Sequence, residues 1–228
     1  MTQRPRLSVD IVSDVMCPWC IIGWLKFEQV MAHFADRLDF RVQWHPFELN
    51  PDMPTEGEDA AAHVMRKYGV SADQSRANSE KMAGIANALG FVFNRGPGFR
   101  MRNSFDAHRL LAWAGALEPP EQAHATGIQT ALKLALFRAH FTDNRDVSDH
   151  AVLADVAASV GLDAVRAATI LASDDFGDIV RAEESYWADR NITGVPAFIL
   201  DGRMLVPGAQ DPEVFVRVIE NKVLAPAS

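Results

Sequence analysis

The sequence predicts an α/β fold in which a long helical insertion divides one small sheet into two parts. Alternating apolar and polar residues predict strands near both ends of the chain. A strand, a helix and a second strand follow one another within about the first 50 residues, as in a βαβ unit. From about 52 to 190 the pattern is mostly helical. The chain therefore combines a sheet domain with a helical one.

The first strand is predicted over 7–14 (LSVDIVSD), where β-branched residues alternate with polar ones, and the second over 40–48 (FRVQWHPFE). Between them, a helix is predicted from about 18 to 36. Its evidence is a mostly apolar stripe at helical spacing: Ile21, Trp24, Leu25, Glu28, Met31, and Phe34 or Ala35.

The insertion begins with an Ala-rich helix over 59–68 that stops at Gly69. Ser71 and Gln74 form a capping-box pattern that opens a second helix, which ends before Gly90. Residues 93–104 carry turn signals and predict a loop. Five more helices are predicted at about 105–117, 121–141, 148–160, 163–172 and 175–190, with Ser148 and Asp149 as plausible caps.

The C-terminal part predicts a hairpin and a final helix. Residues 195–200 and 203–208 flank Asp201-Gly202, a pair typical of a two-residue type I′ turn. Asp211-Pro212 then provides an N-cap and a proline at the first helical position, and the helix extends to about 223.

The composition of the chain argues against some classes of protein, such as nucleic-acid binders and membrane-spanning proteins. The chain has 228 residues, 48% of them apolar and 23% charged, which is enough for a sizeable core. Its net charge of −8 argues against a nucleic-acid binder, since no dense basic stripe is present. It has no apolar run of 18 residues, so we expect no transmembrane helix, and no secretory signal is visible. We therefore expect a cytoplasmic protein.

The chain uses cysteine only twice, at Cys17 and Cys20 in SDVMCPWC (13–20). A disulfide between them would close a loop of about four residues and would stabilise the fold little. The pair could be half of a zinc site, but the other half is missing, because none of the seven histidines forms an H-x₃₋₅-H pair. We predict no metal and a redox role for the pair.

The predicted position of Cys17, at the N-cap of the first helix, suggests how it would react. The amides of Trp19 and Cys20 would point at the Cys17 sulfur and lower its pKa, while Pro18 fits the first helical position. Cys20 could then resolve a mixed disulfide formed on Cys17. Asp14 could relay protons to Cys20 or could be a surface acid.

A second stretch, NITGVPAFILDG (191–202), contains Val195-Pro196. Taken alone, this X-Pro bond would be trans. Together with Cys-Pro-Trp-Cys, however, the G-V-P-x-F strand resembles the thioredoxin superfamily, and the long helical insertion resembles its DsbA-like members. The segments DVMCPWCIIGWLKFE, PFELNPDMP, KYGVS, AHRLL, GVPAFIL and PGAQ are similar to the FrnE-like branch, and more distantly to 2-hydroxychromene-2-carboxylate isomerases and kappa-class glutathione transferases. The resemblance covers about 7–220.

The resemblance implies a thioredoxin fold with a DsbA-like all-α insertion. The thioredoxin-like domain would be discontinuous, 1–51 and 191–228, and the inserted helical domain would be 52–190. Val195-Pro196 would be cis and beside the cysteines, with the Val195 backbone free to pair with an extended peptide or with glutathione. Pro18 and Trp19 would complete the apolar rim of the substrate site.

The resemblance also implies a DsbA-like thiol–disulfide oxidoreductase, with Cys17 as nucleophile and Cys20 as resolving thiol. It would need no bound cofactor, and its partners would be protein thiols or small thiols such as glutathione. The related isomerases generally carry serine where Cys17 stands, and some FrnE-like proteins carry a second cysteine pair that is missing here. Two alternatives stay open: a glutathione-dependent isomerase or transferase of small aromatic substrates, and a non-catalytic peptide-binding module. The chain could be a monomer or a homodimer.

Five other residues are ambiguous in the sequence. RNSFDAHR (102–109) resembles a segment that borders the substrate site of the isomerases. Asn103 or Ser104 could simply cap the following helix, and His108 and Arg109 could face the cleft or pack between helices. His45 could belong to the site, although a structural histidine with satisfied hydrogen bonds is favoured.

Overall fold

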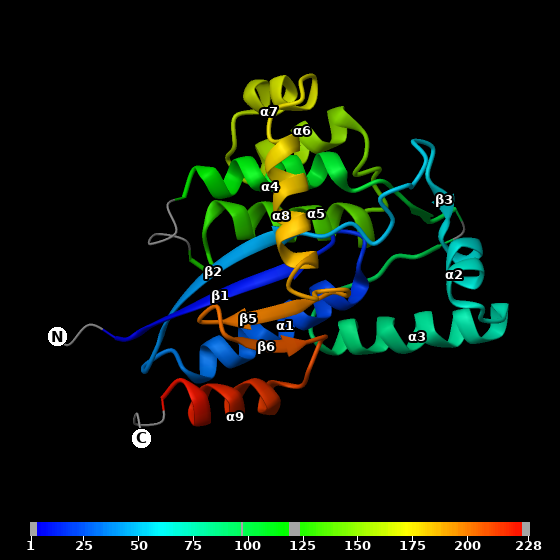
Figure 1. The fold of residues 1–228 in the computed structure, drawn as a ribbon. Coiled ribbons are helices and arrows are strands. Elements are labelled where there is room, and N and C mark those ends of the chain that lie inside the picture. The colour runs from blue at the N-terminus through cyan, green and yellow to red at the C-terminus, as the bar shows by residue number, and fades with distance from the viewer. Residues whose placement is uncertain (1–3, 97, 119–123, 225–228) are drawn as a thin grey trace.

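A computed structural model describes residues 4–96, 98–118 and 124–224. Its centre is a four-stranded sheet in the order β2-β1-β5-β6 (Figure 1). The strands are β1 (Arg6–Ser13), β2 (Asp39–Pro46), β5 (Ala197–Leu200) and β6 (Met204–Pro207). β1 runs parallel to β2 and antiparallel to β5, with Val9 opposite Leu200. The C-terminal hairpin therefore joins the N-terminal strands in one sheet, as predicted.

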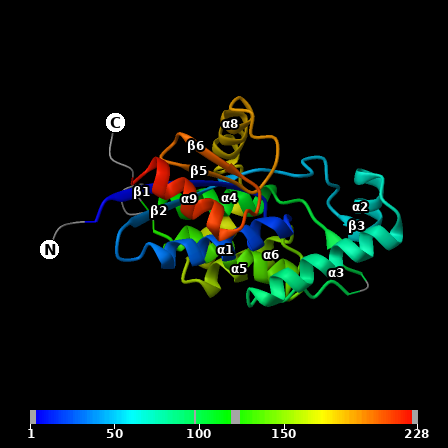
Figure 2. The ribbon, with the colours of Figure 1, turned by 90° about the horizontal axis from the view of Figure 1, so that it is seen from below.

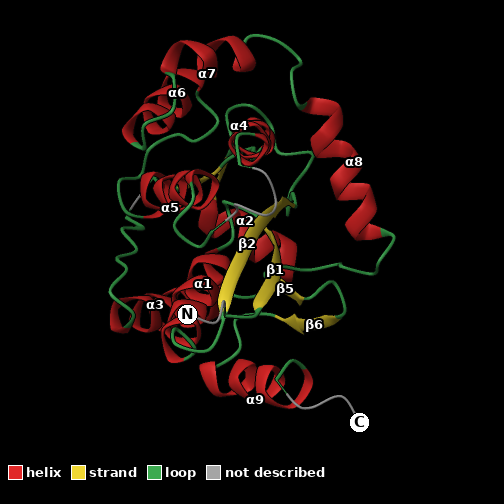
Figure 3. Cartoon of the chain, turned by 90° about the vertical axis from the view of Figure 1, so that its left-hand side faces the viewer, coloured by secondary structure: helices red, strands yellow, loops and turns green. Residues whose placement is uncertain are grey.

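The sheet has helices on both faces (Figure 3). α1 (Pro18–His33) supplies the crossover that parallel strands require, and it lies on one face with α9 (Pro212–Lys222). α8 (Gly177–Ala188) lies on the opposite face. This arrangement is the thioredoxin fold that the sequence predicted.

The face under α1 holds the larger core. Alternate β1 residues point there, and the rings of Phe27, Phe198 and Phe215 meet one another with centroids 5.0 to 5.2 Å apart. Removing one such buried ring would cost about 3–5 kcal/mol. The rings therefore fix α1 and α9 to the sheet.

The buried face of α1 differs from the predicted stripe. Phe27 and Val30 are buried, whereas Glu28 is exposed and Met31 only half-buried. The helix packs against α9, α3 and α5 as well as against the sheet, so apolar contact extends around most of it. A single stripe cannot describe a helix with neighbours on several sides.

The segment between the two parts of the sheet is mostly helical, as predicted. Its helices before α8 are α2 (Ala60–Tyr68), α3 (Ala72–Ala88), α4 (Phe105–Ala116), α5 (Ile128–Phe141), α6 (His150–Ser159) and α7 (Ala164–Leu171). α5 begins later than the predicted residue 121, and 121–123 lie outside the described residues. β3 (Glu58–Asp59) and β4 (Arg100–Met101) were not predicted, because two-residue strands show no periodicity. With α2 and α3 they extend to one side of the sheet (Figure 2).

Local signals at the element ends are confirmed. Gly69 ends α2 with φ 64°, and Ser71 and Gln74 form both hydrogen bonds of the capping box. Asp201 and Gly202 have positive φ, and Arg203 N donates to Leu200 O, as in a type I′ turn. The ladder pairs Leu200 with Met204, however, so the loop has three residues rather than the predicted two.

Two predicted caps behave differently. Asp149 caps α6, but the Ser148 hydroxyl donates to Asp146 instead. Asp211 precedes α9 without a side-chain capping bond, because its carboxylate pairs with Lys26 at 2.7 Å. Within the described residues, none of the helices combines the length and the apolar character needed to cross a membrane.

Candidate active site

The two cysteines lie where β1 meets α1. Cys17 is the N-cap of α1 with an extended backbone, Pro18 occupies the first helical position, and the Cys20 amide donates to the Cys17 carbonyl over 3.1 Å. The cysteines are 3.4 Å apart and form no disulfide. Cys17 is 4% exposed and Cys20 1% exposed. Cys17 is therefore the more accessible of the two.

The GVPAF stretch faces this pair. The Val195-Pro196 bond is cis, as the resemblance implied, and the Cys17 thiol lies 3.7 Å from the Val195 carbonyl oxygen. The strand begins at Ala197 rather than at Val195, so Val195 and Pro196 lie outside the β5 ladder. Residues 178 positions apart in the chain thus meet at one sulfur.

Two large aromatic side chains, those of Trp19 and Tyr68, are exposed. Trp19 is 38% exposed, and Tyr68, at the end of α2, is 60% exposed. Pro18 and Val195 are half-buried and Pro196 is buried. Trp19 and Tyr68 leave apolar surface open to a bound substrate, as is common at interaction sites.

The surroundings of Cys17 raise its pKa overall, although the nearby Cys20 amide lowers it as the position at the start of α1 predicted. The Cys17 sulfur accepts no capping hydrogen bond. Its contact with Cys20 raises the pKa of Cys17 most, and burial and the charges of Cys20 and Asp14 raise it further. Burial also opposes ionisation of Cys20, but the neighbouring Cys17 and Ser13 side chains and the charge of Lys133 lower the pKa of Cys20 overall. The contact between the two sulfurs therefore raises the pKa of Cys17 and lowers that of Cys20.

Asp14 lies beneath the dithiol and is fully buried, so its interpretation as a surface acid is wrong. Its carboxylate accepts hydrogen bonds from the amides of Met16 at 3.0 Å and Leu49 at 2.7 Å, and lies 3.7 Å from His108 Nε2. Burial opposes its ionisation, but His108 and the two amides lower the pKa of Asp14 overall. Asp14 therefore remains an anion under the dithiol.

Lys133 is a residue of this site that the sequence analysis missed. It comes from α5, is fully buried, and its Nζ donates to the Ser13 carbonyl over 3.3 Å. Burial lowers the pKa of Lys133 to about 8, against the opposing charges of Cys20 and Asp14. Its only signal in the sequence is a lysine inside the apolar run ALKLALF, which helical periodicity alone does not distinguish from an exposed position.

In the RNSFDAHR segment, one residue contacts the site, and the others pack helices or lie at the start of α4. His108 Nε2 also lies 3.1 Å from the Phe47 carbonyl, so it links α4 to the site through Asp14. Arg109 points elsewhere and donates to backbone carbonyls around Ile170 and Asp175, which is helix packing. Asn103 accepts from the Phe105 amide and caps α4, whereas Ser104 makes no side-chain cap.

His45 forms a separate charged cluster. Its ring nitrogens lie 3.1 Å from Asp10 Oδ1 and 2.9 Å from Glu183 Oε2, and its ring lies 4.9 Å from that of Trp187. Burial opposes protonation, but the two carboxylates raise the pKa of His45 to about 9. Both ring nitrogens of His45 have partners, and the contact with Glu183 links α8 to the sheet. His45 is therefore a structural histidine with satisfied hydrogen bonds, which is the alternative that the sequence favoured.

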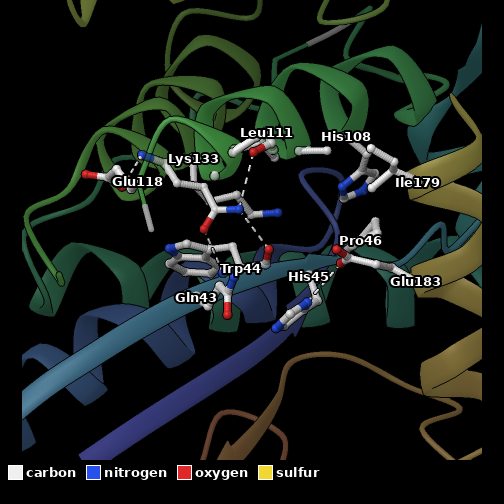
Figure 4. A pocket seen from close by; sticks show the side chains of 14 residues that line it. Gln43, Trp44, His45, Pro46, His108, Leu111, Glu118, Lys133, Ile179 and Glu183 are labelled. Carbon is white, nitrogen blue, oxygen red and sulfur yellow. Dashed lines mark hydrogen bonds and ion pairs between the residues drawn. The ribbon is translucent and has the colours of Figure 1, made fainter. Parts of the chain in front are cut away.

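A cavity of about 280 Å³ lies between β2, α4, α5 and α8 (Figure 4). It is lined by His45, Glu183, His108 and Lys133, among others, and by neither cysteine. The cavity therefore reaches His108 and Lys133, but the sulfurs of Cys17 and Cys20 do not line it. Among the residues that the structure describes, no three His, Cys, Asp or Glu side chains are grouped to hold a metal ion.

The fold and this geometry define a class of protein: thioredoxin-fold proteins whose paired cysteines begin a helix and face a cis-proline. A family model supports this. Residues 8–220 match the DSBA-like thioredoxin domain, and the chain belongs to that family.

Solved structures show the same relationship. A probable DsbA oxidoreductase of Streptomyces coelicolor is similar, with 32% sequence identity, coverage of 97% of this chain and 92% of that chain, and a TM-score of 0.87. The fold is shared with a 2-hydroxychromene-2-carboxylate isomerase (15% identity, 96% and 100% coverage, TM-score 0.63). It is also shared with the cytosolic disulfide reductase DsbM of Pseudomonas aeruginosa, solved with GSH (17% identity, 96% and 100% coverage, TM-score 0.61). The last two likenesses concern the fold alone.

Proposed function

We propose that this protein is a thiol–disulfide oxidoreductase that exchanges disulfides through Cys17 and Cys20. One observation carries the proposal: the Cys17 sulfur lies 3.7 Å from the Val195 carbonyl, next to a cis-proline, with Cys20 at 3.4 Å. A substrate disulfide bound along Val195 would meet the more accessible sulfur first, and the second sulfur is within reach of the first.

The reaction has two balanced steps. Cys17 loses its proton to solvent and attacks one sulfur of a substrate disulfide, the substrate S–S bond breaks, and one substrate thiol leaves after taking up a proton. Cys20 loses its proton and attacks the Cys17 sulfur of the mixed disulfide, which releases the second substrate thiol. The substrate gains two electrons and the protein dithiol becomes a disulfide; the reverse sequence oxidises a substrate.

Lys133 and Asp14 prepare the second step in this proposal. Lys133 favours the Cys20 thiolate by its charge, and its own pKa of about 8 lets it exchange a proton near neutral pH. We assign both as positioning residues, because Lys133 acts on Cys20, the charge of Asp14 acts on Cys17, and neither would contact substrate.

The Val195 backbone is the proposed docking edge. Among the described residues, its amide takes part in no backbone hydrogen bond, so an extended peptide could pair with it. Pro18 and Trp19 would bound the other side of the bound strand.

The raised pKa of Cys17 bears on the direction of exchange. A stable Cys17 thiolate would favour the reduced protein and make its disulfide a strong oxidant. Cys17 lacks that stabilisation, so we propose that the protein acts as a reductase or isomerase of disulfides. Protein thiols or glutathione would be its redox partners, and the cytoplasm, where DsbM acts as a disulfide reductase, would be its location.

A redox titration with thiol trapping tests the proposal, together with insulin reduction. We expect one two-electron transition that involves both cysteines, and insulin reduction that is lost in Cys17→Ser. Cys20→Ser should instead accumulate a mixed disulfide on Cys17. A wild-type protein that neither cycles between dithiol and disulfide nor reduces insulin would contradict the proposal.

The same variants separate the two alternatives. A glutathione-dependent isomerase or transferase would tolerate Cys17→Ser, since serine can occupy that position in the isomerases. A non-catalytic module would bind peptide equally well after Cys17 and Cys20 are both changed to alanine. Either result, with insulin reduction absent from the wild type, would replace the oxidoreductase proposal.

A further inference from the structure

A second cavity, of about 510 Å³, lies among α1, α5, α6 and the turn that follows α3 (Figure 2). Its volume is within the range of about 300–1,000 Å³ that is typical of small-molecule sites. Among the described residues that line it, none belongs to the candidate active site, and neither cysteine is present. The cavity is therefore separate from the dithiol and large enough to hold a small molecule.

The floor of this cavity is apolar. Leu25 of α1, Phe91 after α3 and Leu134 of α5 line it and are half-buried, so part of each side chain is open to solvent. All three pack against the buried cluster under α1, which holds them in place. Covering apolar surface contributes about 25 cal/mol for each Å² removed from water, so this floor favours an apolar ligand.

The charged residues that line the cavity, among those described, are two arginines and one aspartate. Arg138 of α5 is exposed, and its guanidinium forms no ion pair or hydrogen bond with another described residue. Arg145 is already paired, since its Nη2 lies 2.7 Å from Asp155 Oδ2. Asp143 balances only one of the two arginines, so the lining carries an excess positive charge in a chain whose net charge is −8. The cavity therefore favours an anion over a cation.

We propose that this cavity binds a small apolar carboxylate of the medium-chain fatty acid type, with its chain on the apolar floor and its carboxylate on Arg138. A guanidinium presents a planar fork of donors that matches the two oxygens of a carboxylate, and this fork is unused in Arg138. A single negative charge on the ligand equals the excess positive charge of the lining. A cationic ligand of the same length would instead meet two guanidinium groups.

Binding at this cavity does not depend on the proposed redox function. Ile21, which follows Cys20 in the chain, lines the cavity but is only 1% exposed, so the ligand would lie on Leu25 and would not reach the sulfurs. A variant with serine at both Cys17 and Cys20 should therefore bind the carboxylate with unchanged affinity. Absence of carboxylate binding would count against this site alone, and absence of insulin reduction against the proposed function alone.

Isothermal titration calorimetry with octanoate, 1-octanol and octylammonium tests the site. The wild type should bind octanoate at one site, 1-octanol more weakly and octylammonium most weakly. Arg138→Gln should weaken octanoate binding about tenfold, the low end of what a hydrogen bond to a charged group contributes, and should change 1-octanol binding less than twofold. Arg138→Lys should keep part of the preference. Arg217→Gln, an exposed arginine on α9, is the matched control and should change none of the affinities.

A variant of the floor and added salt complete the test. Ala135→Phe fills the cavity from α5 and should weaken octanoate and 1-octanol binding alike; if it does not fold, Arg138→Gln, at an exposed position, still decides. Added salt should weaken the binding of octanoate but not of 1-octanol. The proposal is overturned by a wild type that octanoate does not saturate or that binds octylammonium equally well. Octanoate affinity that is unchanged in Arg138→Gln, or in a folded Ala135→Phe, overturns it too.

Discussion

The Nζ of Lys133 lies 3.3 Å from the carbonyl oxygen of Ser13, inside the protein and beneath the dithiol. This contact brings a helix of the insertion to the end of β1, where the chain turns toward Cys17. A buried lysine without a hydrogen-bonded carboxylate is costly. The charge of Lys133 lowers the pKa of Cys20, so this lysine favours thiol chemistry while its burial lowers the stability of the fold.

Lys133→Met should raise the pKa of Cys20 and slow the resolving step at neutral pH. The loss of one buried positive charge should move the pH profile of that step upward by about one unit. Stopped-flow measurement of mixed-disulfide decay against pH would show the shift. Lys81→Met, at an exposed position of α3, is the control and should leave the profile unchanged.

The same substitution should stabilise the protein at pH 7 by about 1–3 kcal/mol, because folding disfavours the charged form of Lys133. The gain should shrink as the pH rises from about 8 to 10.5, where the unfolded chain still holds a proton that the folded chain has lost. Urea unfolding at several pH values measures this gain in the free energy of unfolding. A destabilised variant at pH 7 would show that the attractions of Lys133 outweigh its burial.

Cys20→Ala should lower the pKa of Cys17, because its contact with Cys20 is the largest cause of the rise. The rate of alkylation of Cys17 by iodoacetamide, measured against pH, would report the change. Cys17→Ala is the reciprocal control and should raise the pKa of Cys20, which Cys17 lowers. If Cys17 titrates identically with and without Cys20, the contact between the two sulfurs does not raise its pKa.

Gly23→Ala should weaken both stability and exchange. A Cβ at residue 23 would lie 3.0 Å from Pro196 Cγ and 3.4 Å from the Phe198 ring. We expect a loss of about 1–3 kcal/mol and slower insulin reduction, as α1 moves away from Pro196. Gly84→Ala in α3, where no atom lies within 4 Å of the new carbon, should instead stabilise by up to about 1 kcal/mol. Thermal unfolding of both variants tests the contrast.

His45→Gln should destabilise the protein in a pH-dependent way. Asp10 and Glu183 raise the folded-state pKa of His45 to about 9, so its contribution is complete below about pH 6.5 and is lost as the pH rises through 9. We expect a deficit of about 1–3 kcal/mol at pH 6 that mostly disappears at pH 10. His33→Gln, on the exposed end of α1, is the control; a deficit that does not change with pH would mean that His45 acts by packing alone.

The local features of the fold were predictable from the sequence. The capping box at Ser71, the turn at Asp201-Gly202 and the proline after Cys17 each depend on residues within four positions of one another, so the chain determines them before it folds. Helix ends were less predictable, as α5 shows, because caps compete with tertiary contacts. β3 and β4 exist only as partners of each other and have no local pattern of their own.

The sequence by itself determined that one dithiol lies where a strand meets a helix, and its resemblance to a family placed a cis-proline beside it. Only the folded chain separates the two thiols, because their neighbours raise the pKa of Cys17 and lower that of Cys20. Lys133 lies 120 residues from Ser13 in the chain. Charges act through space and burial changes their strength, so the state of Cys17 and Cys20 depends on neighbours that no local pattern reveals.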